Sequence, residues 1–538
     1  MITDKQGGLN NDQSAEASTL TGRTLSFSFF TAISRVFGLL RDVVLFHAFG
    51  ASGVMDAFLI AFTIPNVMRR LVAEGAFAVA FVPVYTQVRQ QQSEQAAKRF
   101  FAEAWGALVL VLPGLVALGV IYAKPLVYAF ASGFARDPAK LELAVVLTRW
   151  LFPYLFFVSV LALFMGVLNC HGHFGAPAAA PILLNSCMIG AALAGKTIHA
   201  VAAGVLVAGL LQVLLQLPFL ARQRVLVFPS RPRWSGNMRR LVRMMVPALF
   251  GIVTYQLNII VLRQLASTLP DGSVSYYYIA DRLMQLALGT FAVAVATASL
   301  PTMSAHRSRG QDGGLLQTWL SACRLTHFVT VPAACALAVL AVPIVAVLYG
   351  HGSFVEQDVR AASAAVVVFA PGLVAAGLVR VTVQAFYACQ DMRTPVLVSA
   401  VGVLINGLLG WGLLGYGVVG LGGALTLSTW LQAGVLIGLL HVRMRGGMSA
   451  WVGVLALLRP LGPAAAAIAA AWLVAWRGQW ELGTTLWNVL VLGITVLVGV
   501  CAHLAISAAV GLPEVGWVLT AIRRIIAGVR GRCRESVV

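Results

Sequence analysis

Charged residues are concentrated within residues 34–77, a stretch whose surroundings are largely apolar. The stretch contains four arginines and three carboxylates: Arg35, Arg41, Arg69, Arg70, Asp42, Asp56 and Glu74. A charge at the centre of a membrane helix costs roughly 2.5–3.5 kcal/mol on insertion scales, so several are tolerated when they face one another or a water-filled cavity. Single members of the set could instead lie at helix ends and extend to the lipid headgroups. As a set, they favour a cationic cavity that receives an anionic substrate.

The spacing of these charges distinguishes two kinds of pair. Arg70 and Glu74 are four residues apart, so they share one face of a helix and can form an ion pair. The side chains of adjacent helical residues diverge by about 100°, so a simple pair is not expected within Arg41–Asp42 or Asp281–Arg282. Arginine suits a diphosphate, because its planar guanidinium forms bidentate hydrogen bonds and keeps its charge.

The composition is that of a membrane protein built from helices. Of the 538 residues, 59% are hydrophobic and 11% are charged, and the mean hydropathy is +0.86. A soluble domain carries about a quarter charged residues. Apolar and polar residues alternate along the strands of a β-barrel, whereas the apolar runs of this chain are continuous. The sequence therefore predicts an all-α polytopic membrane protein. The formal charge of +19 indicates loop arginines beside an anionic leaflet and no nucleic-acid partner, because no soluble basic domain is evident.

The sequence does not indicate a metal or a cofactor. The seven cysteines are scattered, lack metal-ligand spacing and imply no disulfide framework. Cys170, His171 and His173 lie close together, but the four ligands of a closed zinc site are not in evidence. We expect an ordinary loop there.

Continuous apolar runs predict fourteen transmembrane helices, since each run is long enough to span a bilayer. The runs are 23–50, 55–88, 102–129, 143–170, 177–195, 200–221, 239–268, 274–304, 315–349, 360–389, 395–415, 418–441, 453–476 and 485–511. Loops rich in arginine and lysine alternate with loops that carry few, which predicts both termini in the cytoplasm. Residues 1–22 form a polar tail and lack the apolar region of a signal peptide.

An internal repeat relates the two halves of the chain. The segment 75–80 (GAFAVA) recurs at 289–294 (GTFAVA), and other matches follow in the same order. Pro153, Cys170 and Pro177 correspond to Pro371, Cys389 and Pro395. Six predicted helices separate the copies, so the copies share an orientation and form a parallel repeat.

The repeat predicts two six-helix bundles followed by an added helix pair. The predicted parts are a polar tail (1–22), an N-terminal bundle (23–222), a basic cytoplasmic loop (223–236), a C-terminal bundle (237–445), helices 13 and 14 (453–511) and a basic amphipathic tail (512–538). A cavity between two such bundles is the usual substrate site of a transporter. The second and eighth helices occupy equivalent places in the repeat, so their charges are expected to converge on that cavity.

The charged motifs resemble those of the MurJ/MviN family. The similar segments are Ser34–Gly38 with Arg41–Asp42, Asp56–Phe58, Pro65–Asn66 with Arg69–Arg70, Glu74–Phe77, Ala280–Leu283, Phe152–Tyr154 and Gln390–Pro395. The resemblance covers nearly the whole chain after the N-terminal tail.

The resemblance implies a flippase, not an enzyme, in the bacterial inner membrane. Its substrate would be lipid II, the peptidoglycan precursor in which a disaccharide peptide is linked to undecaprenyl diphosphate. The implied fold is that of the multidrug/oligosaccharidyl-lipid/polysaccharide exporters, in which the last two helices, here 453–511, form a groove for the lipid tail. The implied cavity residues, together with Glu74, form the candidate substrate-binding site: Arg35, Arg41, Asp56, Arg69, Arg70, Asp281 and Arg282. The expected partners are lipid II and membrane lipids, and the sequence does not identify cell-wall synthesis proteins.

One departure from the family concerns sodium. Some members have a sodium site with acids on helices 7 and 11. Here the corresponding part of helix 7, from Asn258 to Leu265, has no acid, and helix 11 offers Asn406 with Gly410 one turn later. Sodium coupling through that site is therefore not expected.

Two other functions are less consistent with the charges. A cation-coupled exporter of drugs, with the same fold, would need a carboxylate-rich cavity, and this set is rich in arginine. A membrane enzyme acting on polyprenyl phosphates would need acidic metal-binding motifs in its cytoplasmic loops, which here are short and basic. A multidrug or polysaccharide-lipid exporter remains the alternative to a lipid II flippase.

Overall fold

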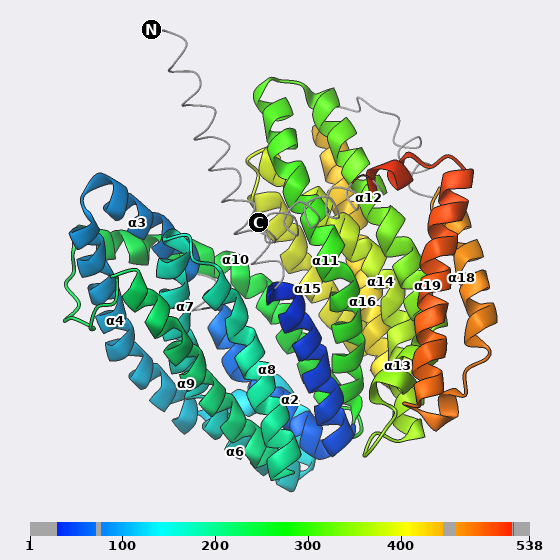
Figure 1. Ribbon diagram of the computed structural model, residues 1–538, viewed down its shortest axis with the longest axis horizontal. Helices are drawn as coiled ribbons and strands as arrows, with labels where there is room; N and C mark the ends of the chain where they lie inside the picture. The colour runs from blue at the N-terminus through cyan, green and yellow to red at the C-terminus, as the bar shows by residue number, and fades with distance from the viewer. Residues whose placement is uncertain (1–29, 72–76, 445–458, 519, 521–538) are drawn as a thin grey trace, which may run out of the picture. The chain divides into compact units, whose positions relative to one another are not determined.

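The computed structural model describes the chain except residues 1–29, 72–76, 445–458, 519 and 521–538. Every regular element among the described residues is a helix, which confirms the predicted all-α fold. The chain divides into two compact units, Met1–Val274 and Ser275–Val538, whose helices are labelled in Figure 1.

The first unit begins with a helix over residues 30–49. Its other elements are α2 (Gly53–Arg69), α3 (Ala78–Gln91), α4 (Glu94–Ile121), α5 (Ala123–Ala131), the 3₁₀ turn η2 (Ser132–Arg136), α6 (Pro138–Leu151), α7 (Tyr154–Cys170), α8 (Gly175–Gly195), α9 (Ile198–Arg222) and α10 (Gly236–Ser267).

The second unit contains almost all of α11 (Ser273–Ser308). It continues with α12 (Asp312–Val339), α13 (Ala341–Tyr349), α14 (Glu356–Ala388), α15 (Arg393–Gly412), η3 (Leu414–Tyr416), α16 (Gly417–Arg443), α18 (Leu461–Ala475), η4 (Trp480–Leu482) and α19 (Leu486–Ala509).

Capping side chains explain where several helices begin. Ser93 accepts a hydrogen bond from the backbone N–H of Ala96 at the start of α4, and Thr197 accepts one from Ala200 at the start of α9. Asp137 caps α6, in which proline occupies the first position. These residues accept hydrogen bonds from N–H groups that the first turn leaves unpaired, and proline has no such group to satisfy.

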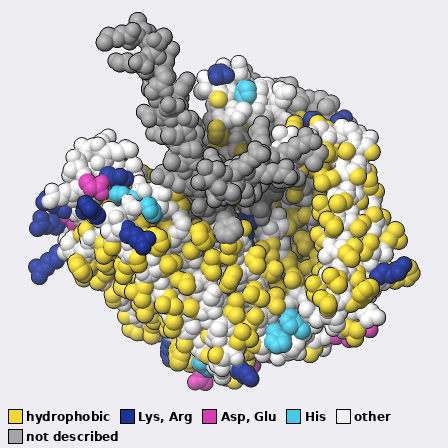
Figure 2. Space-filling model, in the orientation of Figure 1, with side chains coloured by type: hydrophobic (Ala, Val, Ile, Leu, Met, Phe, Trp, Pro, Cys, Tyr) yellow, Lys and Arg dark blue, Asp and Glu magenta, His cyan; other side chains and the backbone are white. Residues whose placement is uncertain are grey.

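Each unit has its own apolar core. In the first, aromatic rings pack between α3, α4 and α7: Phe81 stacks on Phe100 with ring centroids 5.4 Å apart, and Phe101 meets Phe164 edge-on at 5.9 Å. In the second, a core of buried side chains joins α11, α12, α14 and α16. Figure 2 shows hydrophobic side chains over the sides of the helices as well, as expected for surfaces that face lipid.

The helix pair α18–α19 packs against α12 and α13 of the second unit, and the two helices lie side by side in Figure 1. Thr484 Oγ1 donates to the carbonyl of Val347 at 2.7 Å, and His503 Nε2 lies 3.1 Å from the carbonyl oxygen of Phe328. Residues 513–518 are helical and begin the predicted amphipathic segment. Nearly all the rest of that segment lies outside the described residues.

Each of the fourteen predicted apolar runs coincides with described helix over much of its length. Within the described residues, nine helices are long and apolar enough to span a membrane, or ten if the bent α11 counts as one span. The remaining runs coincide with the helix at 30–49, with α2 and α3, with the 32-residue α10 and with α18, and α2 ends just before the gap at 72–76. The arrangement is consistent with the predicted fourteen helices.

The division into compact units differs from the boundary that the repeat suggests. The repeat places residues 237–268 in the C-terminal bundle, but α10 packs against α3, α5 and η2 of the first unit. Gln264 Oε1 of α10 accepts from the N–H of Ser132 at 2.9 Å, and Ser267 Oγ accepts from that of Gly133 at 3.2 Å. The repeat-based boundaries stay a prediction.

Candidate functional site

Arg41 is buried in the helix at 30–49 and is held by two neighbours. Its Nε and Nη2 donate to Asp42 Oδ1 at 3.0 and 2.6 Å, and its Nη1 donates to Asn185 Oδ1 of α8 at 3.2 Å. Asn185 in turn donates from Nδ2 to the carbonyl of Ser34 at 3.3 Å. The guanidinium is thus fixed in orientation by a second helix.

The expectation that Arg41 and Asp42 do not pair is wrong. The directions of their Cα–Cβ bonds diverge, but the long arginine side chain folds back far enough to form an ion pair at 2.6 Å. Both residues are at most 9% exposed. Because an unpaired buried charge would be costly, the adjacent carboxylate lowers the cost of placing Arg41 inside the unit.

Asp56 lies in the first turn of α2 and is fully buried. Its Oδ2 accepts from Lys140 Nζ of α6 at 3.1 Å and from the N–H of Gly272 at 2.9 Å. The same ammonium lies 2.7 Å from Asp271 Oδ1 and 4.3 Å from the centre of the Phe134 ring. These groups tie α2 and α6 to the segment that follows α10.

The role of Lys140 was not predicted from the sequence. The residue precedes the apolar run at 143–170, where a lysine is ordinarily assigned to a solvated loop. The structure shows instead that its side chain is only 7% exposed. A pocket of about 290 Å³ borders the cluster and is lined in part by Arg136, Lys140 and Asp271.

The other arginines of this stretch are half-buried. Arg69, the last residue of α2, donates from Nε to Asn66 Oδ1 at 3.1 Å, and Asn66 is fixed by its bond to the carbonyl of Phe62 at 2.7 Å. Arg35 and Arg70 are also partly accessible. Glu74, and with it the predicted Arg70–Glu74 pair, lies outside the described residues.

Two of the predicted site residues belong to the second unit. Asp281 and Arg282 lie on α11 and are half-buried. Gln285, one turn along the same helix, donates from Nε2 to Asp281 Oδ2 at 2.6 Å. Sequence spacing did not indicate this contact, although an i, i+4 pair on one helix is a common arrangement.

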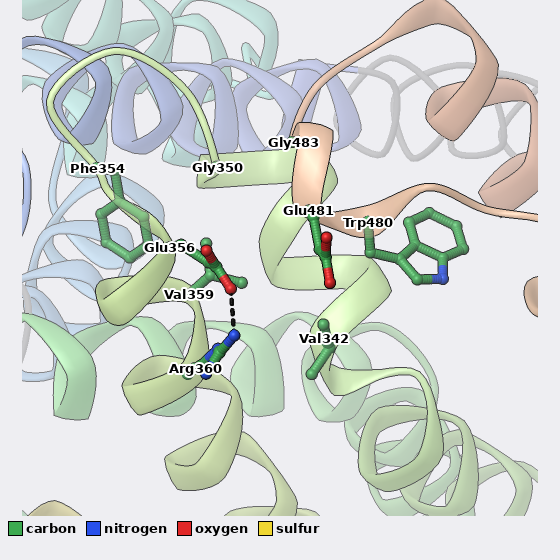
Figure 3. Close-up of a pocket in the computed structure, with 9 residues that line it drawn as sticks. All are labelled: Val342, Gly350, Phe354, Glu356, Val359, Arg360, Trp480, Glu481 and Gly483. Carbon is green, nitrogen blue, oxygen red and sulfur yellow. Dashed lines mark hydrogen bonds and ion pairs between the residues drawn. The ribbon is translucent and has the colours of Figure 1, made fainter.

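A pocket of about 220 Å³ in the second unit is separate from these residues. It lies where α13 and α14 meet the connection between α18 and α19 (Figure 3), and Glu356 forms an ion pair with Arg360 at its side. A Cβ on Gly483 would lie 1.8 Å from the carbonyl oxygen of Gly350. Gly483 has a φ of +63°, so both close approach and backbone conformation require glycine there.

The helical fold is shared with solved membrane transporters. A multidrug resistance MATE family transporter of the MOP superfamily, in its inward-facing conformation, matches 77% of this chain and 94% of its own with a TM-score of 0.64 at 14% identity. A structure described as lipid II flippase MurJ, inward closed conformation, matches 90% of this chain and 99% of its own with a TM-score of 0.74 at 23% identity. These likenesses establish the fold.

Sequence comparison places the chain within that class. The family model described as lipid II flippase MurJ matches residues 45–506. Lipid II flippase MurJ of Burkholderia cenocepacia is 38% identical over 71% of this chain and 75% of its own, and the probable lipid II flippase MurJ of Rhizobium tropici is 31% identical over 91% and 94%. The chain belongs to the MurJ family, so it is a multi-pass membrane transporter and not an enzyme.

Proposed function

We propose that this chain moves lipid II from the cytoplasmic to the outer leaflet of the bacterial inner membrane. The proposal is supported by the family assignment and by the names of relatives that align over most of their length. A diphosphate headgroup does not cross hydrocarbon unaided, because transfer of an ionised group into an apolar medium is prohibitive. The protein must therefore offer groups that replace water around the phosphates.

The fixed orientation of the Arg41 guanidinium is the main structural support for the proposal. Its guanidinium is held by an acid on its own helix and an amide from α8, so it is oriented before any substrate arrives. Arg35 lies on the same helix as Arg41. Arg69 and Arg70 lie at the end of α2, and Arg282 lies on α11. We assign these five arginines to the diphosphate, with Asp56, Glu74 and Asp281 as the acids of the site.

We propose that transport proceeds by alternating access, in which the site opens to one side of the membrane at a time. The internal repeat supports this mechanism, since transporters built from such repeats bind substrate where the repeats meet. A free-energy difference of a few kcal/mol between the two states keeps both populated. The lipid tail would remain in the bilayer or along helices 13 and 14.

Depletion of the protein in its native bacterium tests the function directly. Lipid II should accumulate in the cytoplasmic leaflet, and wild-type protein should restore its export. Arg282→Ala, and Arg41→Ala combined with Asp42→Asn so that no buried carboxylate loses its cation, should insert normally but fail to restore export. Arg41→Lys should also lose much of the activity, because an ammonium cannot form bidentate bonds with a diphosphate.

The matched control is Arg99→Ala, which removes an exposed arginine from α4 and should restore export fully. If both alanine variants at 41 and 282 restored export as well as this control, the arginines would have no part in binding the substrate. If depletion left the distribution of lipid II unchanged, the proposed function itself would be wrong.

We also propose that both termini face the cytoplasm, as the distribution of loop arginines predicts. A cysteine introduced at the exposed Ser353 should react with an impermeant reagent added outside the cell. A cysteine at the exposed Arg231 should react only after the membrane is opened. Reaction of the cysteine at 231 in intact cells would reverse the orientation.

A further inference from the structure

Residues 225–235, between α9 and α10, form an extended segment that we call the strap. It contains no helix, and Pro229 and Pro232 lie within it; proline fixes φ and cannot continue a helix. Side chains alternate along its first half. Val225 is fully buried and Val227 packs against the core of the first unit, whereas Leu226 and Phe228 are 42% and 87% exposed.

The strap is attached to α4 at defined points. The N–H of Ser230 donates to the carbonyl of Ala102 at 3.0 Å, and Ser235 Oγ donates to Glu103 Oε2 at 3.1 Å while also capping α10. A Cβ on Gly106 would lie 1.7 Å from the carbonyl oxygen of Ser230, so the backbone of the strap lies directly on the glycine. Such attachment holds the strap in a fixed position on the unit.

The strap and the first turns of α10 present arginines and large aromatic side chains outward. Residues 222–243 contain no acid and seven arginines: Arg222, Arg224, Arg231, Arg233, Arg239, Arg240 and Arg243. Trp234 is 66% exposed and Phe228 is 87% exposed. In Figure 1 the strap follows the edge of the first unit beside α4, and Figure 2 shows Lys and Arg side chains gathered along that edge.

Three of these arginines line one pocket. Arg239, Arg240 and Arg243, with Gly236 and Met244, surround about 390 Å³ at the start of α10. Within the part of the chain that the structure describes, none of the three has an acid as an ion-pair partner. Leu241 is buried in the core, so α10 is anchored on one side while the arginines are exposed on the other.

We propose that the strap and this pocket bind anionic phospholipid at the membrane surface, with the arginines on the phosphate groups and Phe228 and Trp234 in the headgroup region. The charge is of one sign, tryptophan favours the interface between headgroups and hydrocarbon, and phenylalanine occurs on the apolar face of segments that lie in that interface. The surface follows α9, a helix long and apolar enough to span a membrane, which places it near the level of the headgroups. Each arginine near an anionic leaflet raises local affinity about fivefold.

The test uses the full chain in nanodiscs, with the native cysteines replaced by serine. A Trp234→Cys variant carries an environment-sensitive fluorophore, and the lipids include a quencher attached at shallow depth. Emission should be quenched in discs containing phosphatidylglycerol, and less in discs of phosphatidylcholine alone. Three arginines at about fivefold each correspond to about a hundredfold in affinity. The triple change Arg239→Gln, Arg240→Gln and Arg243→Gln should therefore prevent the added quenching that phosphatidylglycerol causes.

The matched control removes three charges from exposed arginines at the end of α11, in the turn after it and at the start of α15 of the second unit: Arg307→Gln, Arg309→Gln and Arg393→Gln. It should leave the lipid dependence of the reporter unchanged. Equal quenching in both kinds of disc would overturn the proposal, and so would an equal shift in the control, which would reflect net charge alone. Quenching relieved by inorganic diphosphate, with no dependence on phosphatidylglycerol, would assign the pocket to a soluble anion instead.

Discussion

Replacement of Lys140 by methionine should strongly destabilise the first unit. The ammonium lies 3.1 Å from Asp56 and 2.7 Å from Asp271, and the side chains of Lys140 and Asp56 are 7% and 1% exposed. Methionine keeps the length and apolar character of the side chain but removes the ammonium that lies beside the buried Asp56 carboxylate. Removal of one partner from a buried ion pair costs about 3–5 kcal/mol.

Asp271 provides an internal comparison for this prediction. Its side chain is 63% exposed, so water replaces much of its interaction with Lys140, and such pairs contribute about 0–1 kcal/mol. Asp271→Asn should therefore cost much less than Lys140→Met, although each removes one charge of the Lys140–Asp271 pair. The order of the two effects follows from burial alone, because the two distances are similar.

The free energy of unfolding can be measured by equilibrium denaturation of the purified protein in mixed detergent micelles. The control is Lys124→Met, which removes an exposed lysine from the neighbouring helix α5 and should change stability little. The double variant Lys140→Met with Asp56→Asn should recover part of the loss, since the buried carboxylate beside Lys140 is neutralised as well. If Lys140→Met cost no more than Lys124→Met, the ion pair would not stabilise the unit.

Three further predictions concern stability and can be tested by the same measurement. Gly106→Ala should destabilise the protein by about 1–3 kcal/mol, because the new methyl group meets the backbone of Ser230. Gly114→Ala, on the same helix with nothing within 4 Å of the new methyl group, should be neutral or stabilising. Equal effects of the two changes would show that the strap moves freely. Asp391→Ala should cost about 1 kcal/mol, because Asp391 accepts a hydrogen bond from the N–H of Thr394 at 3.0 Å at the start of α15. That bond is the main reason why the pKa of Asp391 is lowered from 3.8, so the stability advantage of the wild type should be complete above pH 3.8 and vanish as the pH falls through the lowered pKa. An advantage that persisted in strong acid would contradict this. Burial, and to a smaller extent the charge of Arg89, lowers the pKa of His171 from 6.5. The unfolded chain therefore binds a proton first as the pH falls, and stability should decline below about pH 6.5 towards the folded pKa. His171→Gln should flatten this decline, and an unchanged profile would exclude His171 as its cause.

The helices could be predicted from sequence because a membrane leaves few alternatives. A continuous apolar run of sufficient length satisfies its backbone hydrogen bonds only as a helix, and each predicted run coincides with described helix. The breaks within runs were harder to predict. The run at 315–349 is interrupted at Leu340, between α12 and α13, and the run at 143–170 is interrupted at Phe152–Pro153. Such breaks preserve the average hydropathy and change only the local geometry.

The partners of the charged residues could not be predicted from sequence. The contact from Arg41 to Asn185 joins residues 144 apart, and the contact from Lys140 to Asp56 joins residues 84 apart. Neither separation is a helical period or an offset of the repeat, so no spacing rule indicates it. The prediction that Arg41 and Asp42 do not pair was wrong for a different reason. The prediction used the direction of the Cα–Cβ bonds, which does not limit the reach of an arginine.

The structure divides the charges of the first unit into two kinds. Arg41 and Asp56 each have a buried or nearly buried partner of opposite sign, Asp42 and Lys140, so their burial is compensated within the unit. Arg35, Arg69 and Arg70 are half-buried and can change their degree of exposure at lower cost. A group that binds and releases a diphosphate must exchange water for phosphate repeatedly, and the second kind can follow the phosphate as it moves. Arg41 instead offers a charge whose orientation is fixed before the diphosphate binds, so loss of Asp42 should impair the orientation of Arg41 and not its charge.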